Sequence, residues 1–123
     1  MLLNSKKTLV LGASDNPARY SYLAINRLKE HNHPIVAIGK RNTMVSGIPV
    51  QSVTAPIPDL DTVTLYLNTN NQKEYYNYIL SQQPRRVIFN PGSENPEFEK
   101  ILNDKGIQTM EACTLVLLGT GQY

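Results

Sequence analysis

Cysteine and long apolar runs are almost missing from this sequence. Cys113 is the single cysteine among 123 residues, so an internal disulfide is excluded and a reducing compartment is expected. No apolar stretch approaches the roughly 20 residues that a membrane-spanning helix needs. The segment before Lys6 is too short for a secretory signal. We therefore expect a cytoplasmic protein that does not engage a membrane.

Strong charge of either sign is also missing. Lys and Arg number 12 and Asp and Glu number 10, which gives a formal net charge of +2. The basic residues are scattered apart from the pairs Lys6-Lys7, Lys40-Arg41 and Arg85-Arg86. This balance is too weak to indicate nucleic-acid binding. A chain of this length and ordinary composition is expected to form one domain, residues 1–123.

Groups that could carry catalysis are scarce. His31 and His33 are expected at a helix end, on the side of the sheet opposite any ligand crevice. No His or Cys cluster has the spacing of metal ligands. The run Gly12-Ala13-Ser14-Asp15-Asn16 lacks the Gly-x-Ser-x-Gly frame of a nucleophile elbow. We therefore expect no metal site and no catalytic residue, which favours a protein that is not an enzyme.

What the sequence does contain is a regular alternation of apolar strand-like runs and helical patterns. The expected strands are 9–11, 35–38, 47–50, 61–67, 86–89 and 107–110, with 47–50 at a sheet edge because Pro49 cannot donate to a ladder. Four helices are expected. The first follows strand 9–11 and ends near residue 32, the second spans 70–83, and the third spans 95–106. The fourth spans 111–118, unless that run is an apolar tail. This alternation predicts an α/β fold, a single Rossmann-like, doubly wound, mostly parallel sheet with helices on both faces.

The fold prediction leads to a site prediction. In sheets of this kind, ligands bind beyond the carboxyl ends of the strands. The segments that follow the strands should therefore meet at one rim, and they are Gly12–Tyr20, Gly39–Asn42, Asn68–Asn71 and Asn90–Asn95.

The first of these segments has the features of a phosphate loop. Gly12 ends a buried strand, and without a Cβ it lets the backbone approach a bound group. The helix that follows, capped either by Asn16-Pro17 or later by Ser21, points its N-terminus into the same crevice. The Ser14 hydroxyl and Arg19 would add contacts. The later positions of the dinucleotide fingerprint G-x-G-x-x-G hold serine and proline here, which disfavours NAD. A tight connection without a ligand is the alternative.

The second segment discriminates between nucleotides. In NAD-binding folds the second strand ends in Asp or Glu, which holds the ribose hydroxyls. This chain has Lys40-Arg41 there, and the next acid is Asp59. A basic pair would attract a phosphorylated ribose, which NADP and coenzyme A (CoA) both carry. A pair that is simply exposed to solvent is the alternative.

The third and fourth segments are rich in asparagine. Asn70 or Asn71 is expected to cap the following helix, whereas Asn68, directly after the strand, is expected to contact a ligand. Asn90-Pro91-Gly92 forms a second glycine-containing turn between strand and helix, where Gly92 permits close backbone approach. An ordinary turn is the alternative.

These motifs together resemble a known family. The turn G-A-S-x-N-P-x-R/K-x-S over 12–21, the basic residue after the second strand, and the run Gly47-Ile48-Pro49-Val50 are similar to the small CoA-binding domain proteins. Those proteins are stand-alone relatives of the N-terminal CoA-binding domain in the α subunit of succinyl-CoA synthetase. The resemblance extends from about Thr8 to the segment at Cys113.

The resemblance implies a Rossmann-like domain that binds CoA across the strand ends. The implied cofactor contacts are Gly12, Ala13, Ser14 and Arg19 in the phosphate loop, Lys40 at the ADP phosphates, Leu67 and Asn68 beside the adenine or the pantetheine arm, and Asn90, Pro91 and Gly92 in the next rim loop. Two runs, 66–68 and 88–92, depart from the arginine motif and the W-x-Q-like run of many members. The synthetase's phosphorylated histidine lies in a domain that this chain lacks, so ligase activity is not implied.

We therefore expect a non-catalytic module that binds CoA or an acyl-CoA through the first loop, Lys40 and Arg41. An NADP-dependent or other nucleotide-dependent enzyme is one alternative. A redox protein in which Cys113 forms a mixed disulfide with CoA is another. The expected partner is a small nucleotide cofactor, with a homodimer or an unidentified protein partner also open, because the apolar run Leu115–Leu118 fits either a core or a dimer contact.

Overall fold

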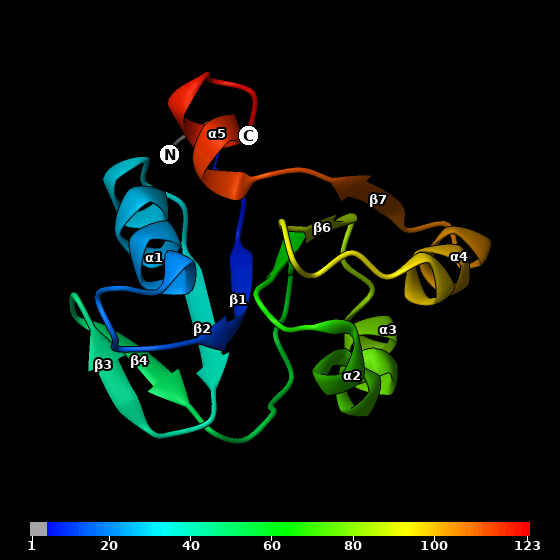
Figure 1. Ribbon diagram of the computed structural model, residues 1–123, viewed down its shortest axis with the longest axis horizontal. Helices are drawn as coiled ribbons and strands as arrows, with labels where there is room; N and C mark the ends of the chain where they lie inside the picture. The colour runs from blue at the N-terminus through cyan, green and yellow to red at the C-terminus, as the bar shows by residue number, and fades with distance from the viewer. Residues whose placement is uncertain (1–4) are drawn as a thin grey trace.

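A mixed sheet forms the centre of the molecule. The computed structural model describes residues 5–123, and within them the sheet has 7 strands in the order β3-β4-β2-β1-β5-β6-β7 (Figure 1). Every neighbouring pair is parallel except β3 and β4. The strands are β1 Thr8–Ala13, β2 Ile35–Gly39, β3 Thr43–Val45, β4 Ile48–Gln51, β5 Thr62–Leu65, β6 Arg86–Phe89 and β7 Gln108–Glu111.

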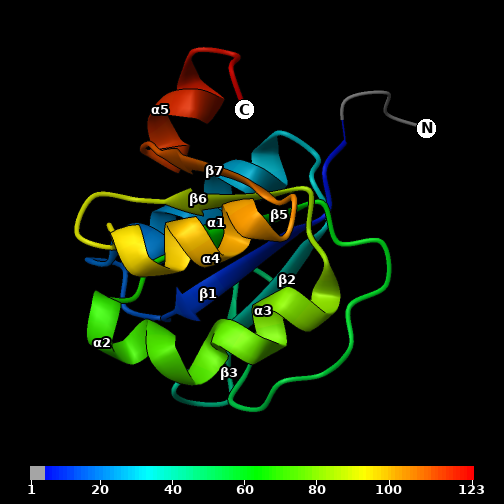
Figure 2. The same cartoon turned by 90° about the vertical axis from the view of Figure 1, so that its right-hand side faces the viewer.

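Helices cover both faces of this sheet. One face carries α1 and α5, and the other carries α2, η1, α3 and α4 (Figures 1 and 2). The helices are α1 Tyr20–Glu30, α2 Thr69–Gln72, the 3-10 helix η1 Lys73–Tyr75, α3 Tyr76–Gln82, α4 Pro96–Asp104 and α5 Thr114–Gly119. The longest of them, α1, has 11 residues, and no helix in residues 5–123 is both long and apolar enough to cross a membrane.

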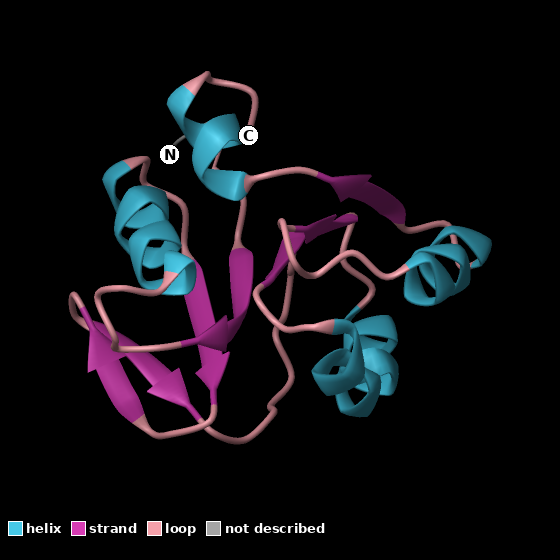
Figure 3. Cartoon of the chain, viewed as in Figure 1, coloured by secondary structure: helices cyan, strands magenta, loops and turns pink. Residues whose placement is uncertain are grey.

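The side chains of the central strand β1 are apolar on both faces of the sheet, so both faces have to be buried. Its side chains alternate between two cores, with Leu9 and Leu11 packed toward α3 and α4, and Val10 packed toward α1 and α5. Ile79 and Phe98 come from the helices of the first core, and Ile25 comes from α1 in the second. A strand buried on both faces reads as a continuous apolar run, which is the pattern of the sequence here. The predicted doubly wound α/β fold is confirmed (Figure 3).

The predicted edge position of 47–50 is wrong. Strand β4 lies between β2 and β3, and the additional strand β3 forms the edge. The turn between β3 and β4 holds Ser46 and Gly47, whose φ angles of 50° and 83° suit a tight hairpin. Pro49 is tolerated in β4 because pairing with β2 begins only at Val50.

The start of α1 also differs from both predicted caps. The N-cap is Arg19, which makes no side-chain capping bond. The Asn16 side chain instead accepts from the Ala18 backbone N–H at 3.0 Å, which closes a turn ahead of the helix. Ser21 is a buried residue inside α1. The helix therefore begins between the two predicted starts, after the Asn16 cap and before the Ser21 cap.

Candidate functional site

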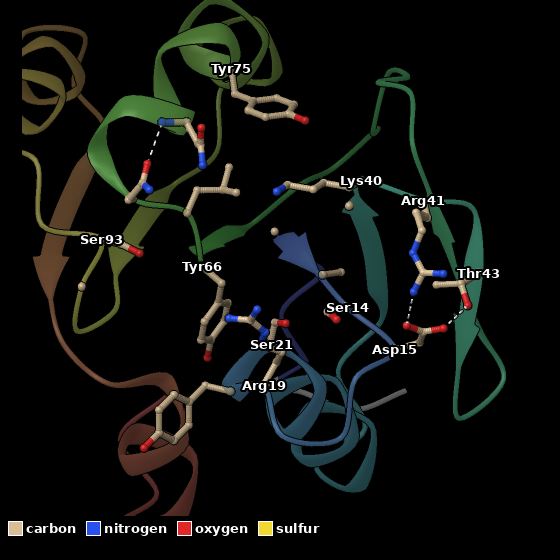
Figure 4. Close-up of a pocket in the computed structure, with 18 of the residues that line it drawn as sticks. Ser14, Asp15, Arg19, Ser21, Lys40, Arg41, Thr43, Tyr66, Tyr75 and Ser93 are labelled. Carbon is tan, nitrogen blue, oxygen red and sulfur yellow. Dashed lines mark hydrogen bonds and ion pairs between the residues drawn. The ribbon is translucent and has the colours of Figure 1, made fainter.

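The carboxyl ends of the central strands surround one pocket. The chain runs from β1 to β2 on one side and returns to β5 on the other, so the strand order switches between β1 and β5. A cavity of about 530 Å³ lies at this switch point, where ligands bind in doubly wound folds. All four predicted rim segments contribute to its wall (Figure 4). The lining residues are Gly12–Asp15, Arg19–Ser21, Gly39–Arg41, Thr43, Tyr66–Asn68, Asn71, Glu74, Tyr75 and Pro91–Ser93.

Two glycines let the strands close together beneath the cavity. Gly12 has a φ of +92°, and a Cβ placed on it would lie 2.5 Å from the backbone oxygen of Tyr66. A Cβ on Gly39 would lie 2.1 Å from the backbone oxygen of Ala13. The space that the missing Cβ of Gly12 leaves is thus filled by Tyr66 and Leu67, which follow β5, and not by a ligand as predicted. Both glycines shape the floor of the pocket.

The first loop offers polar groups to the cavity. The Ser14 hydroxyl accepts from the Asn16 backbone N–H at 3.1 Å, which leaves its own O–H free to donate. Arg19 is exposed and lines the cavity at the start of α1. The positive end of the α1 dipole lies at the same position. Three predicted residues, Gly12, Ala13 and Ser14, line the pocket with Arg19, so the structure brings this predicted group together.

The two basic residues after β2 have different surroundings. The Lys40 side chain extends into the cavity, whereas Arg41 lies at its outer wall (Figure 4). The Arg41 guanidinium donates through Nη2 to Asp15 Oδ1 at 2.7 Å. Lys40 takes part in none of the ion pairs found in residues 5–123. The predicted pair therefore presents one unpaired cation to a ligand, at Lys40.

The segment after β5 corrects the predicted roles of its asparagines. Asn68 is the N-cap of α2, and its side chain accepts from the Asn71 backbone N–H at 2.8 Å. Neither Asn70 nor Asn71 is the cap, because the helix begins at Thr69. Asn68 nevertheless lines the cavity with Leu67, and their contact with a cofactor stays a prediction. Its side-chain NH₂ group can still donate to a ligand while the oxygen caps the helix.

The segment after β6 separates its predicted residues. Pro91 and Gly92 line the cavity, but Asn90 does not. The Asn90 side chain is 2% exposed and donates to Thr64 Oγ1 at 2.7 Å and to the Leu65 carbonyl at 2.9 Å. Its oxygen accepts from the Thr114 backbone N–H at 2.8 Å. Asn90 therefore ties β5, β6 and α5 together, and the predicted contact with a cofactor is not supported.

This role predicts a loss of stability. Asn90→Ala would leave the buried Thr114 N–H without its acceptor, and we expect the free energy of unfolding to fall by about 2–3 kcal/mol. Asn68→Ala removes only an exposed helix cap, for which about 1 kcal/mol is expected. Urea unfolding of both variants measures the difference. Similar losses for the two would contradict the structural role of Asn90.

Sequence reasoning missed several residues of the pocket, notably Asp15, Tyr66 and Tyr75. The Tyr66 hydroxyl is buried and has no hydrogen-bond partner in the described chain. The hydroxyls of Thr64 and Thr114 bond to each other at 2.8 Å. Burial raises the pKa of Tyr66 to about 12. Burial also raises the pKa of Tyr75, with a smaller contribution from Glu74. Both phenols therefore stay neutral at physiological pH and give the cavity uncharged aromatic wall.

The chemically reactive side chains lie elsewhere. Cys113 is half-buried before α5 and is not among the cavity's lining residues. His33 accepts from the Lys6 backbone N–H at 2.9 Å and packs against Tyr123 at 4.8 Å between ring centroids. No group of three metal-ligating side chains occurs in the part of the chain that the structure describes. The pocket thus offers cations, hydroxyls, amides and aromatic surface, a set suited to binding an anionic ligand.

Solved structures share this fold over nearly the whole chain. A crystal structure of an uncharacterized protein is 49% identical and matches with a TM-score of 0.94, covering 97% of this chain and 98% of the other. A hypothetical protein from Pyrococcus horikoshii OT3 is 23% identical, with a TM-score of 0.82 and coverage of 92% and 81%. A protein from Thermus thermophilus, cell-free ID.343, is 21% identical, with a TM-score of 0.80 and coverage of 97% and 91%.

Sequence comparison supplies the family. Among curated proteins, none matches the sequence. The CoA binding domain family matches residues 6–119, which include every strand, every helix and all four segments around the cavity. With the pocket at the strand ends and the family resemblance of its first loop, this match identifies the chain as a member of the CoA binding domain family.

Proposed function

We propose that this protein is a non-catalytic module that binds CoA or an acyl-CoA in the cavity at the strand ends. The first loop would hold the nucleotide phosphates, and Lys40 would meet a phosphate at the end of β2. The observation that carries the proposal is the position of Lys40, whose side chain reaches into the cavity that Gly12 and Ser14 also line (Figure 4). Family membership supports the choice of CoA among nucleotides.

The composition of the cavity wall fits such a ligand. Its volume of about 530 Å³ lies within the usual range for small-molecule sites. CoA combines phosphates with a long uncharged arm, and the wall combines the cations Arg19 and Lys40 with the apolar surface of Leu67 and Tyr75. Bound CoA would supply a thiol that carries acyl groups. This chain's residues would bind and orient the cofactor, with the Ser14 O–H and the amide of Asn68 as donors.

The kinds of side chain that line the cavity support a binding role without catalysis. Its titratable lining residues are Asp15, Glu74 and the basic and phenolic groups already described, and Cys113 and both histidines lie outside it. The proposal therefore assigns holding rather than turnover to this site.

Isothermal titration calorimetry with CoA, dephospho-CoA and NADPH tests the proposal. We expect CoA to bind at least about tenfold more tightly than dephospho-CoA, because one charge-assisted contact to the ribose phosphate is worth roughly 1.5–3 kcal/mol. Equal affinity for CoA and dephospho-CoA would contradict the phosphate contact. No heat with CoA would contradict the function itself, and tighter binding of NADPH would favour an NADP-dependent protein instead.

A further inference from the structure

The feature that the proposed function leaves unexplained is Asp15. It belongs to the loop that would hold phosphates, where a carboxylate repels the ligand. Both of its oxygens bond across the pocket wall to residues that follow β2, one in the turn and one at the start of β3. Oδ1 accepts from Arg41 Nη2 at 2.7 Å, and Oδ2 accepts from the Thr43 hydroxyl at 2.8 Å (Figure 4).

The surroundings fix this arrangement from both sides. Below it, the backbones of β1 and β2 touch, since a Cβ on Gly39 would lie 2.1 Å from the Ala13 oxygen. Beside it, the Asn42 side chain accepts from the Ser52 backbone N–H at 2.9 Å, which anchors the turn after β2 to the end of β4. The loop after β1 and the turn after β2 are therefore both held in place, and the Asp15 carboxylate stays in contact with the Arg41 guanidinium.

The pairing divides the charges of the pocket. Its basic lining residues are Arg19, Lys40 and Arg41, and its acids are Asp15 and Glu74. Arg41 has a counter-ion in contact, whereas Lys40 joins none of the ion pairs of residues 5–123. A phosphate that arrives at the end of β2 therefore meets an available ammonium group in the cavity, whereas the guanidinium at the outer wall is neutralised by Asp15.

We infer that Asp15 is a specificity-determining residue of this pocket. It withholds Arg41 from the ligand and makes Lys40 the cation at the end of β2 that recognises a phosphate. The inference rests on the proposed function, because it concerns how strongly the CoA site prefers a ligand with a ribose phosphate. It also predicts that this preference increases when the charge of Asp15 is removed.

The size of the effect follows from exposure. The side chains of Arg41 and Asp15 are 73% and 34% exposed, and ion pairs in such positions contribute at most about 1 kcal/mol. That energy corresponds to a factor of up to about five in affinity. A phosphate must compete with Asp15 for Arg41, so we expect the carboxylate to lower phosphate selectivity by about twofold to fivefold.

The test measures the dissociation constants of CoA and dephospho-CoA by calorimetry and compares their ratio among variants. Asp15→Asn removes the charge but keeps an acceptor for Thr43, and we expect it to raise the preference for CoA by about twofold to fivefold. Arg41→Gln in the wild-type background should leave the ratio nearly unchanged. In the double variant D15N/R41Q the gain should disappear, because the released guanidinium is its source.

Two further variants separate the ion pair from other effects of Asp15. Glu74→Gln removes a carboxylate elsewhere on the same cavity wall, and its effect on the ratio should be smaller than that of D15N. Thr43→Val deletes the second bond to Asp15 but keeps the ion pair, so the ratio should stay at the wild-type value.

Four results would overturn the inference. An equal loss of affinity for both ligands in D15N would mean that Asp15 only stabilises the loop between β1 and α1. A fall in the ratio in R41Q would mean that Arg41 already contacts the phosphate. An increase in the preference for CoA in E74Q equal to that in D15N would mean that the effect comes from the overall charge of the pocket and not from the Asp15–Arg41 ion pair. These three leave the proposed function intact, whereas wild-type protein that binds neither ligand would overturn both.

Discussion

Replacing Gly39 with alanine is expected to lower the free energy of unfolding by about 3 kcal/mol, as overpacking a closed core does. The added Cβ would lie 2.1 Å from the backbone oxygen of Ala13 and 3.1 Å from a methyl group of Val50. A backbone atom cannot move aside as a side chain can, so β1 and β2 must separate. Urea unfolding measures the loss, and calorimetry should show weaker CoA binding because these strand ends carry Ser14 and Lys40.

A second glycine provides the matched control. Gly119 ends α5, and a Cβ on it would meet nothing within 4 Å. Gly119→Ala should therefore change the free energy of unfolding little, or raise it slightly, since alanine is the better helix former. If Gly39→Ala proved as stable as Gly119→Ala, the close contact between β1 and β2 would be wrong, and with it the shape of the pocket floor.

Lys40→Met is expected to weaken CoA binding by about tenfold or more, the loss of one charge-assisted hydrogen bond to a phosphate. Methionine keeps most of the length of the side chain and removes the ammonium group, with its charge and its N–H donors. Since Lys40 is exposed and makes no ion pair in residues 5–123, the thermal midpoint of unfolding should stay close to that of the wild type. Dephospho-CoA binding should change less than CoA binding.

Lys105→Met is the control for the change in net charge. Lys105 is exposed at the end of α4 and does not line the cavity. It should leave the affinity for CoA unchanged apart from a small long-range effect, which added salt should suppress. Equal losses in the two lysine variants would show that CoA responds to the overall charge of the protein, and the assignment of Lys40 would fail.

The sheet and the rim of the pocket could be predicted from sequence because both follow from local patterns. Runs such as 9–11 and 86–89 are short and mostly apolar, as expected of strands buried on both faces, and the residue after each strand end is fixed once the strand is known. That is enough to place 12–20, 39–42, 68–71 and 90–95 on one rim.

Two parts of the fold were not predicted correctly, because their sequence signals are weak or depend on tertiary contacts. Strand β3 has 3 residues, with the exposed Met44 at its centre, and it forms only because the Ser46-Gly47 turn brings it back onto β4. The start of α1 was misplaced because Asn16 completes a turn of its own, a bond that competes with helix capping.

Side-chain roles at the rim were harder to predict than the rim itself. Asn68 and Asn90 both lie shortly after a strand, yet one is an exposed cap beside the cavity and the other is buried between β5 and α5. The ion pair of Asp15 and Arg41 joins residues 26 positions apart, and each lies in a loop. No pattern along the chain distinguishes such cases, because the partners are set by how the strand ends pack.

The central claim, that the cavity at the strand ends holds CoA, is tested most directly by backbone amide chemical shifts of ¹⁵N-labelled protein titrated with CoA. The account predicts shift changes at Gly12, Ser14, Lys40 and Gly92, which line the cavity, and none at Gly106, which does not. Changes confined to the amino ends of the strands, or no saturable change with CoA at all, would contradict it.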